Sequence, residues 1–206
     1  MSPFKDMITK ESELRALLGH PSPIAIDKSI EKLDEHCVDY IKRSPMCFIS
    51  TSNHSGTCDV SPRGDAPGFV HVLDSKHLII PERPGNRRFD SILNMLDNPH
   101  IGILFIIPRL DETLRINGKA CIVSDSDLLA QMEVRGKSPL IGIGVEVEEC
   151  FIHCGKAFKR SNLWNVEHWH DPSELPNASK MIAAHAKEQP GKVHASLMET
   201  YEKRLY

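Results

Sequence analysis

Two adjacent arginines, Arg87 and Arg88, stand in PERPGNRRFDS, immediately before a predicted helix. The first turn of a helix already carries a partial positive charge from its unpaired N–H groups, and the two guanidinium groups add to that field. Guanidinium groups bind phosphate oxygens in pairs, and the N–H groups of the first turn supply further donors. Taken alone, the motif fits a phosphate site and a solvated basic turn equally well.

Two further segments place charged side chains on predicted strands. In DVSPRGDAPG, a strand ends in a loop rich in Pro and Gly, which presents Ser61, Arg63 and Asp65 together. Arg115 interrupts the apolar rhythm of ETLRINGKA. We expect it to be buried beside an anion, because an unpaired buried arginine is very costly. Three such places in one small domain favour the anion site.

Apolar periodicity and turn residues predict the elements that must position these side chains. A helix is expected up to Gly19, and another from Asp27 to Arg43 with Asp27 as its N-cap. Short helices follow in FDSILNMLDN and DSDLLAQMEV, and two more in the tail, separated by Pro190-Gly191. The strand-like segments are residues 46–53, 58–63, 68–74, 77–81, 101–108, 112–124 and 139–154, which we interpret as about six strands.

The connections between the predicted strands are short, so most neighbours should be antiparallel. This predicts an α+β fold with a six-stranded antiparallel sheet that closes into a barrel. We expect one domain over residues 1–206, with helices over about 1–43 and a helical tail over about 171–206. The Asn-Gly pair inside the strand 112–124 predicts a bulge or a tight bend.

Composition excludes several classes of protein. The chain has 206 residues, a hydrophobic fraction of 40% and a formal net charge of -3, which suit one globular domain without a general attraction to nucleic acid or to an anionic membrane. The longest apolar run, IGILFII, is too short to span a bilayer, and no leader pattern opens the sequence. We therefore expect a cytoplasmic protein whose six cysteines are reduced core thiols.

Several motifs resemble the FMN-binding family of the pyridoxamine 5′-phosphate oxidases, in its broad oxidase-like class. They are DVSPRGD, HLIIPERPGNRRFDSILNMLDNP, IGILFIIP, ETLRINGKA and CFIHCGKAFKRSNLW, within about residues 28–170. The resemblance implies a split β-barrel homodimer with FMN held between the subunits. True pyridoxamine phosphate oxidases carry an arginine- and histidine-containing segment near the carboxyl terminus. The tail HASLMETYEKRLY does not resemble that segment, so we do not expect vitamin B6 oxidation.

The resemblance also implies a set of cofactor-binding residues. Within one subunit they are Ser61, Arg63, Ile80, Pro81, Asn86, Arg87, Arg88, Thr113, Leu114 and Arg115, and from the other subunit Lys156, Arg160, Ser161 and Trp164. Arg87 and Arg88 would hold the FMN phosphate, and Asn86 would shape the turn. A flavin needs its phosphate neutralised, its ring covered and a cation or N–H donor near N1 and O2. Arginines, Trp164 and the lysines of GKAFKR would meet these needs.

The expected function is that of an FMN-dependent oxidoreductase acting on an unidentified small molecule, with NADH or NADPH as the donor. No side chain stands out as a general acid, base or nucleophile, so a non-catalytic flavin carrier is one alternative. Relatives on the same fold bind haem or a deazaflavin, and His185 and His194 are conceivable haem ligands. The residues Cys150, His153, Cys154, His168 and His170 are of zinc-ligand types. Because the first three fall on a predicted strand, we expect no metal.

Overall fold

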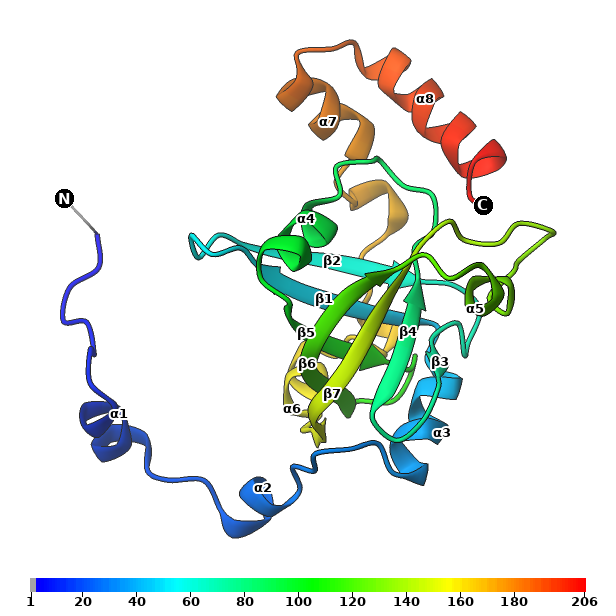
Figure 1. The fold of residues 1–206 in the computed structure, drawn as a ribbon. Helices are drawn as coiled ribbons and strands as arrows, with labels where there is room; N and C mark the ends of the chain where they lie inside the picture. The colour runs from blue at the N-terminus through cyan, green and yellow to red at the C-terminus, as the bar shows by residue number, and fades with distance from the viewer. Residues whose placement is uncertain (1–2) are drawn as a thin grey trace.

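The computed structural model describes residues 3–206, and the first two residues of the predicted helical region 1–43 lie outside it. Seven strands, one more than predicted, form a single antiparallel sheet in the order β2-β1-β5-β6-β7-β4-β3 (Figure 1). Their bounds are β1 Met46–Ser52, β2 Cys58–Gly64, β3 His71–Val72, β4 His77–Pro81, β5 His100–Ile106, β6 Thr113–Val123 and β7 Gly142–His153. The α+β class and the antiparallel pairing are confirmed.

The sheet is not closed, so the predicted closed barrel is wrong for the single chain. Within the described residues, β2 pairs only with β1, and β3 pairs only with β4. The two edge strands therefore form no backbone hydrogen bonds with each other. Side chains connect the two edges instead. Arg63 of β2 forms an ion pair with Glu82, directly after β4, and Asp65 accepts a hydrogen bond of 2.8 Å from Arg83 Nε. The curled sheet is therefore bridged by charge and not by backbone pairing.

Alternation along the strands separates a buried face from an outer face. In β1, Cys47, Ile49 and Thr51 are buried, while their neighbours are half-buried or exposed, and β5 has the same pattern. The buried face and α3 (Glu35–Arg43) enclose the core, which includes Tyr40, Ile41, Ile80, Phe105, Leu114 and Ile116. The core therefore fixes the direction of every side chain on the strands that flank it.

The predicted bulge is confirmed at the Asn-Gly pair of β6. Asn117 lies opposite Glu149 and Gly118 opposite Val147, so Glu148 of β7 has no partner of its own. A Cβ atom on Gly118 would lie 2.0 Å from the carbonyl oxygen of Glu146, which no side chain can tolerate. Glycine is therefore required at this position by the close approach of the two backbones.

Of the predicted helix from Asp27 to Arg43, only α3 (Glu35–Arg43) is helical beyond Asp27, and a separate short helix, α2 (Pro23–Asp27), precedes it. Asp27 is the last residue of α2, and Asp34 is the N-cap of α3 through a 2.8 Å hydrogen bond from the Cys37 amide. Between the helices, Ile30 forms a bridge with Cys150 of β7. The apolar residues from Ile30 to Ile41 recur at helical spacing, but the first part of this segment pairs with the sheet and is not helical.

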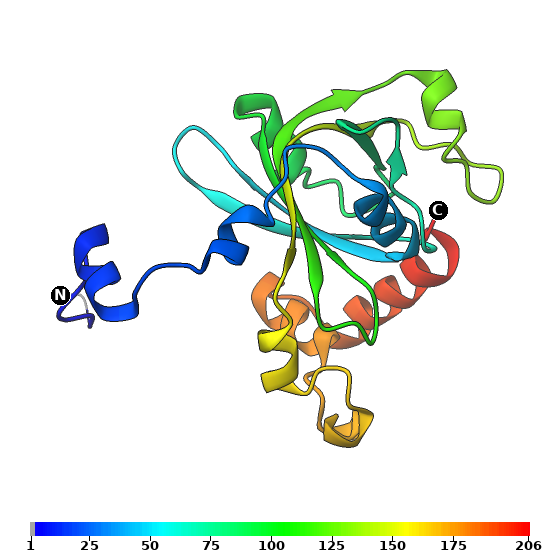
Figure 2. The same cartoon turned by 90° about the horizontal axis from the view of Figure 1, so that it is seen from below.

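The remaining helices are α1 Glu11–Leu18, α4 Asp90–Asp97, α5 Ser126–Ala130, α6 Lys156–Ser161, α7 Ala178–Ala186 and α8 Pro190–Lys203, with short 3₁₀ turns at Val166–His168 and Pro172–Glu174. Pro190 and Gly191 are the first residues of α8, so the two tail helices are separated by residues 187–189 and not, as predicted, by this pair. The amino-terminal segment with α1 and α2 extends away from the sheet (Figure 2). Among the helices of residues 3–206, none has the length and apolar character needed to cross a bilayer.

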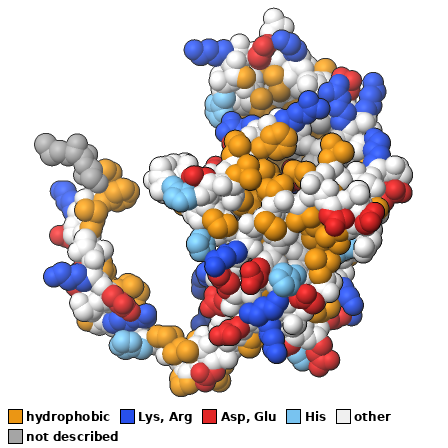
Figure 3. Space-filling view, viewed as in Figure 1, with side chains coloured by type: hydrophobic (Ala, Val, Ile, Leu, Met, Phe, Trp, Pro, Cys, Tyr) orange, Lys and Arg blue, Asp and Glu red, His pale blue; other side chains and the backbone are white. Residues whose placement is uncertain are grey.

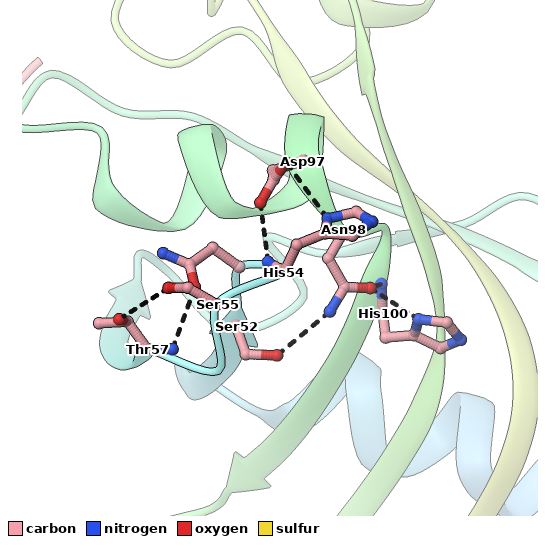
Figure 4. Close-up of polar contacts among 8 residues, drawn as sticks. Ser52, His54, Ser55, Thr57, Asp97, Asn98 and His100 are labelled. Atoms are coloured by element: carbon pink, nitrogen blue, oxygen red, sulfur yellow. Dashed lines mark hydrogen bonds and ion pairs between the residues drawn. The ribbon is translucent and has the colours of Figure 1, made fainter.

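Polar contacts hold the carboxyl-terminal end of α4 against the β1–β2 hairpin (Figure 4). Asp97 accepts a 2.7 Å hydrogen bond from the His54 amide. Asn98 donates to Ser52 Oγ at 3.2 Å, and its side-chain oxygen lies 2.8 Å from His100 Nδ1. These contacts fix one end of the helix, and its other end borders the candidate site.

The six cysteines divide evenly between the core and the surface, so the prediction of six core thiols is half wrong. Cys37, Cys47 and Cys150 are buried, whereas Cys58, Cys121 and Cys154 are exposed, and all six are free thiols. The Sγ atoms of Cys37 and Cys150 lie 3.9 Å apart, in hydrogen-bond contact.

Candidate functional site

A cavity of about 330 Å³ lies where the end of β2, the segment 82–89 and the start of α4 meet. Its lining residues are Ser61, Pro62, Arg63, Gly64, Phe69, Pro81, Glu82, Arg83, Pro84, Gly85, Asn86, Arg87, Arg88, Phe89, Asp90 and Ser91. In the space-filling view, Lys and Arg side chains form a band below the tail helices, above an exposed hydrophobic area (Figure 3). The segment 82–89 runs through that band in the same view of Figure 1.

The turn before α4 has an unusual backbone. Arg87 and Phe89 have φ angles of 61° and 59°, in the left-handed region that residues other than glycine seldom adopt. The Asn86 side-chain oxygen accepts a 3.0 Å hydrogen bond from the Arg88 amide across this turn. Such conformations cost about 1–3 kcal/mol each and persist where the surrounding structure enforces them, as it does at many ligand-binding turns.

Helix α4 presents its first turn to the cavity. Its cap residue, Phe89, gives no side-chain hydrogen bond to the first turn, and Asp90 and Ser91 line the cavity. Ser91 Oγ lies 3.1 Å from Ser61 Oγ of β2. Deeper along the helix, Asn94 donates to Thr51 at 3.1 Å and to Asp59 at 2.8 Å. The sheet therefore holds the amino-terminal end of α4 in place, where its dipole favours an anion.

The lining carries four arginines and two carboxylates, a net charge of +2. Arg63 is paired with Glu82, and Arg88 Nε lies 2.9 Å from Asp90. For Arg87, no ion pair is recorded within residues 3–206. The Arg63 Nε atom is buried and has no hydrogen-bond partner in the same part of the chain, so it is a donor without an acceptor. Arg83 is paired with Asp65, which lies outside the lining, so Arg87 is the arginine of the lining whose charge an anion would balance.

The structure brings six of the predicted residues into this cavity, and they are Ser61, Arg63, Pro81, Asn86, Arg87 and Arg88. Ile80 is fully buried beside it, and Thr113 and Leu114 are buried in β6. Arg115 is exposed and not buried as expected. In place of a carboxylate it contacts Asn117 at 3.4 Å and lies over the Phe151 ring, 5.5 Å from its centroid.

The predicted contribution of a second subunit lies elsewhere in the single chain. Lys156, Arg160 and Ser161 are exposed on α6, outside the lining of the cavity. Trp164 stacks on Phe158, and its indole N–H donates to the Leu110 carbonyl at 3.0 Å. Their role depends on how two copies assemble and stays a prediction.

The cavity is also lined by residues that the sequence alone did not indicate, and they include Phe69, Glu82, Arg83 and Asp90. Arg83 was within reach, because it is the first of three arginines in PERPGNRR. It also lines a smaller cavity of about 170 Å³, together with Asp65, Phe69, His71 and residues 131–134. Phe69 and Arg83 are therefore shared by the two cavities.

Two ionisable groups beside Arg83 have shifted pKa values. Burial alone would raise the pKa of Asp65, but hydrogen bonds from Tyr206, the Ala66 amide and Arg83 outweigh it and lower that pKa. Burial, and then the positive charge of Arg83, lower the pKa of His71. At neutral pH the wall of the smaller cavity thus holds a carboxylate and an uncharged imidazole.

Within the described residues, His, Cys, Asp and Glu form no group of three or more that could hold a metal ion. Of the zinc-ligand types noted in the sequence, Cys150 is buried against Cys37, whereas His153, Cys154, His168 and His170 are exposed.

A comparison with protein-family models matches residues 33–154, more than half of the chain, to the model described as pyridoxamine 5′-phosphate oxidase. The chain belongs to the pyridoxamine 5′-phosphate oxidase-like family of FMN-binding proteins. The resemblance seen in the motifs is thereby confirmed. The matched segment begins at Leu33 and ends at Cys154, so it contains the whole sheet and the arginine cavity.

Solved structures similar to this pyridoxamine 5′-phosphate oxidase-like chain include Group A Streptococcus HupZ, with 19% identity, a TM-score of 0.48 and coverage of 58% of this chain and 93% of that one. An FMN-binding protein from Syntrophomonas wolfei has 8% identity, a TM-score of 0.46 and coverages of 70% and 96%. An F420 reductase has 19% identity, a TM-score of 0.42 and coverages of 57% and 98%. A search of curated proteins found no match.

Proposed function

We propose that this chain binds FMN and acts as a cytoplasmic, FMN-dependent oxidoreductase on a small molecule. The observation that supports it most is the cavity at the start of α4, which is lined by four arginines, one of which, Arg87, has no carboxylate partner among the described residues. A phosphate monoester carries close to two negative charges at neutral pH. Arg87 and the buried Arg63 Nε offer it donors that no other described group uses.

The site assigns a different task to each of its parts. Arg87, Arg88 and the first-turn amides of α4 hold the phosphate, and Asn86 keeps the turn in shape. Arg63 and Ser61 of β2 border the phosphate or the ribityl chain. When bound, the flavin supplies the redox chemistry, and the protein binds it, orients it and controls the access of the substrate.

We also propose that the active form is a homodimer with the flavin at the interface. The outer face of the sheet, which an antiparallel sheet normally presents as polar, is apolar along Met46, Phe48, Val60, Pro62, Leu104 and Ile106. Cross-strand pairing places Phe48 between Pro62 and Leu104. Pro62 and Gly64 also line the cavity, so the cavity opens at the margin of this face. The family resemblance assigns Lys156, Arg160, Ser161 and Trp164 of a second copy to the same site.

Haem and deazaflavin are the alternative ligands. His194 Nδ1 lies 3.3 Å from Ser179 Oγ of α7, and both His194 and His185 are exposed. An arginine cavity of net positive charge suits the phosphate of FMN or of a deazaflavin cofactor better than a haem iron.

The cofactor is tested by adding FMN, deazaflavin F420 and haem in turn to the purified, ligand-free chain and recording absorption spectra after gel filtration. FMN should stay with the protein and give the flavin bands near its free spectrum. Retention of haem or F420 in preference to FMN would refute the cofactor assignment.

Enzyme and carrier are separated by a second measurement on the FMN-loaded protein. Anaerobic NADH or NADPH should bleach the flavin band, as an oxidoreductase requires. A flavin that stays oxidised with every common donor would favour the carrier function.

A further inference from the structure

Tyr206 lies against the wall that the two cavities share. Its hydroxyl donates to Asp65 Oδ1 at 2.7 Å, and the other carboxylate oxygen of Asp65 accepts from Arg83 Nε at 2.8 Å. The Tyr206 ring lies between two cations, 5.8 Å from the guanidinium carbon of Arg83 and 4.9 Å from that of Arg135. Lys137 Nζ donates to the Tyr206 carbonyl at 2.7 Å. One residue thus contacts three separate segments of the body.

The residues that Tyr206 contacts at the cavity wall are largely buried. The Asp65 side chain is only 2% exposed and that of Arg83 only 16%. With Nε held by Asp65, the remaining N–H donors of Arg83 are the ones left for a ligand in the larger cavity, which Arg83 lines. A movement of the Asp65 carboxylate would therefore change the position of the Arg83 guanidinium in the larger cavity.

The contacts also determine where the tail helices attach. Helices α7 and α8 pack on each other, and no residue of α8 is buried. Both views show the end of α8 beside the loop that follows α5 (Figures 1 and 2). Among the described residues, the hydrogen bonds that join residues 177–206 to the rest of the chain are those of Tyr206 with Asp65 and Lys137.

We propose that Tyr206 is a positioning residue for the cofactor site: through Asp65 it fixes Arg83 at the wall of the larger cavity, so that docking of α8 and binding of the cofactor's phosphate stabilise each other. This inference rests on the proposed function. The coupling is reciprocal, because two binding events linked by one free energy must affect each other equally. The segment that carries Tyr206 thereby becomes part of the cofactor site.

The test compares the affinities of the full chain for FMN and for riboflavin, which lacks the phosphate, by quenching of flavin fluorescence. Tyr206→Ala should weaken FMN binding by about five- to tenfold and riboflavin binding by less than about twofold, since the loss concerns a guanidinium that faces the phosphate. Tyr206→Phe keeps the ring between the arginines and loses only the hydroxyl, so its effect should be intermediate. Tyr201→Ala, on exposed α8 surface, is the matched control and should leave both affinities unchanged.

Hydrogen exchange of the amides in residues 190–203 supplies the reciprocal readout. FMN should slow this exchange in the wild-type chain and leave it unchanged in Tyr206→Ala. Equal weakening of FMN and riboflavin in Tyr206→Ala would indicate a merely structural role, and unchanged FMN affinity would show no role at all; either result overturns the inference while the cofactor assignment stands. A wild-type chain that binds FMN no better than riboflavin would instead refute the proposed phosphate site, and the inference with it.

Discussion

Arg87 differs from the three other arginines that line the cavity. Arg63, Arg83 and Arg88 each have a carboxylate partner, while Arg87 has none within the described chain. Its backbone is held in the left-handed region directly before α4. A cation held in place without a counter-charge has electrostatic energy to gain from a bound anion.

We therefore predict that Arg87→Ala weakens FMN binding by about 1.5–3 kcal/mol, the scale of a hydrogen bond to a charged group. Isothermal titration measures this directly. Arg15→Ala, at an arginine paired with Glu11 on α1, which extends away from the sheet (Figure 2), is the control and should bind FMN as the wild type does. Unchanged affinity in Arg87→Ala would remove this residue from the phosphate site.

For individual residues of the site, the sequence predicts contacts between residues that are near each other along the chain. The PGNRR turn, the following helix and the hydroxyl and cation of DVSPRGD could be recognised from local pattern. The pairing of Arg63 with Glu82 could not, because it depends on how far the sheet curls. Nor could the contact of Tyr206 with Asp65, which joins residues 141 positions apart in a tail without a recognisable motif.

Helix α3 shows why element boundaries are harder to predict than elements. The spacing of Ile30, Leu33, Cys37 and Ile41 is helical, and Asp27 stands at a suitable place for a cap. In the structure, Ile30 bridges to β7 and the Leu33 amide donates to the Ser75 carbonyl, so backbone pairing overrides the helical pattern until Asp34. Tertiary contacts of this kind leave no periodic signal in the sequence.

Asp34, the observed N-cap of α3, and Asp27, the N-cap expected from the sequence, can be distinguished by substitution. Asp34→Ala should lower the free energy of unfolding by about 1 kcal/mol at pH 7, the usual contribution of an N-cap, while Asp27→Ala should change it little. The hydrogen bond from the Cys37 amide lowers the pKa of Asp34 below its ordinary value of 3.8. A lowered pKa means that the stabilisation is present in full above the unfolded value and is lost as the pH falls through the folded value.

Urea unfolding at pH 7 and near pH 3 measures both effects. The difference between wild type and Asp34→Ala should shrink at the lower pH. A larger loss of stability in Asp27→Ala than in Asp34→Ala would contradict the observed helix boundary.

At the level of the whole molecule, the exposed outer face of the open sheet is the surface on which we expect a second copy of the chain to pack. Its outer face is apolar over β2, β1 and β5, and the arginine cavity opens at the edge of that face. The residues of α6 that the family resemblance assigns to the cofactor lie outside the cavity of their own chain. A twofold assembly through the outer face would satisfy both observations.

We predict that the wild-type chain sediments with twice the mass of one chain, and that Val60→Asp, at a side chain 68% exposed on the outer face, shifts it to the monomer and weakens FMN binding. Leu18→Asp, at a side chain 73% exposed on α1, which extends away from the sheet (Figure 2), is the matched control and should remain dimeric. A wild-type monomer that binds FMN tightly would contradict the proposed interface.

We propose that the arginine cavity recognises the phosphate of a flavin. This is tested by the ratio of the dissociation constants of the wild-type chain for riboflavin and FMN, measured at two salt concentrations. The claim predicts that FMN binds at least about tenfold more tightly, and that added salt reduces this preference because it screens charge. Equal affinity for the two flavins, at either salt concentration, would contradict it.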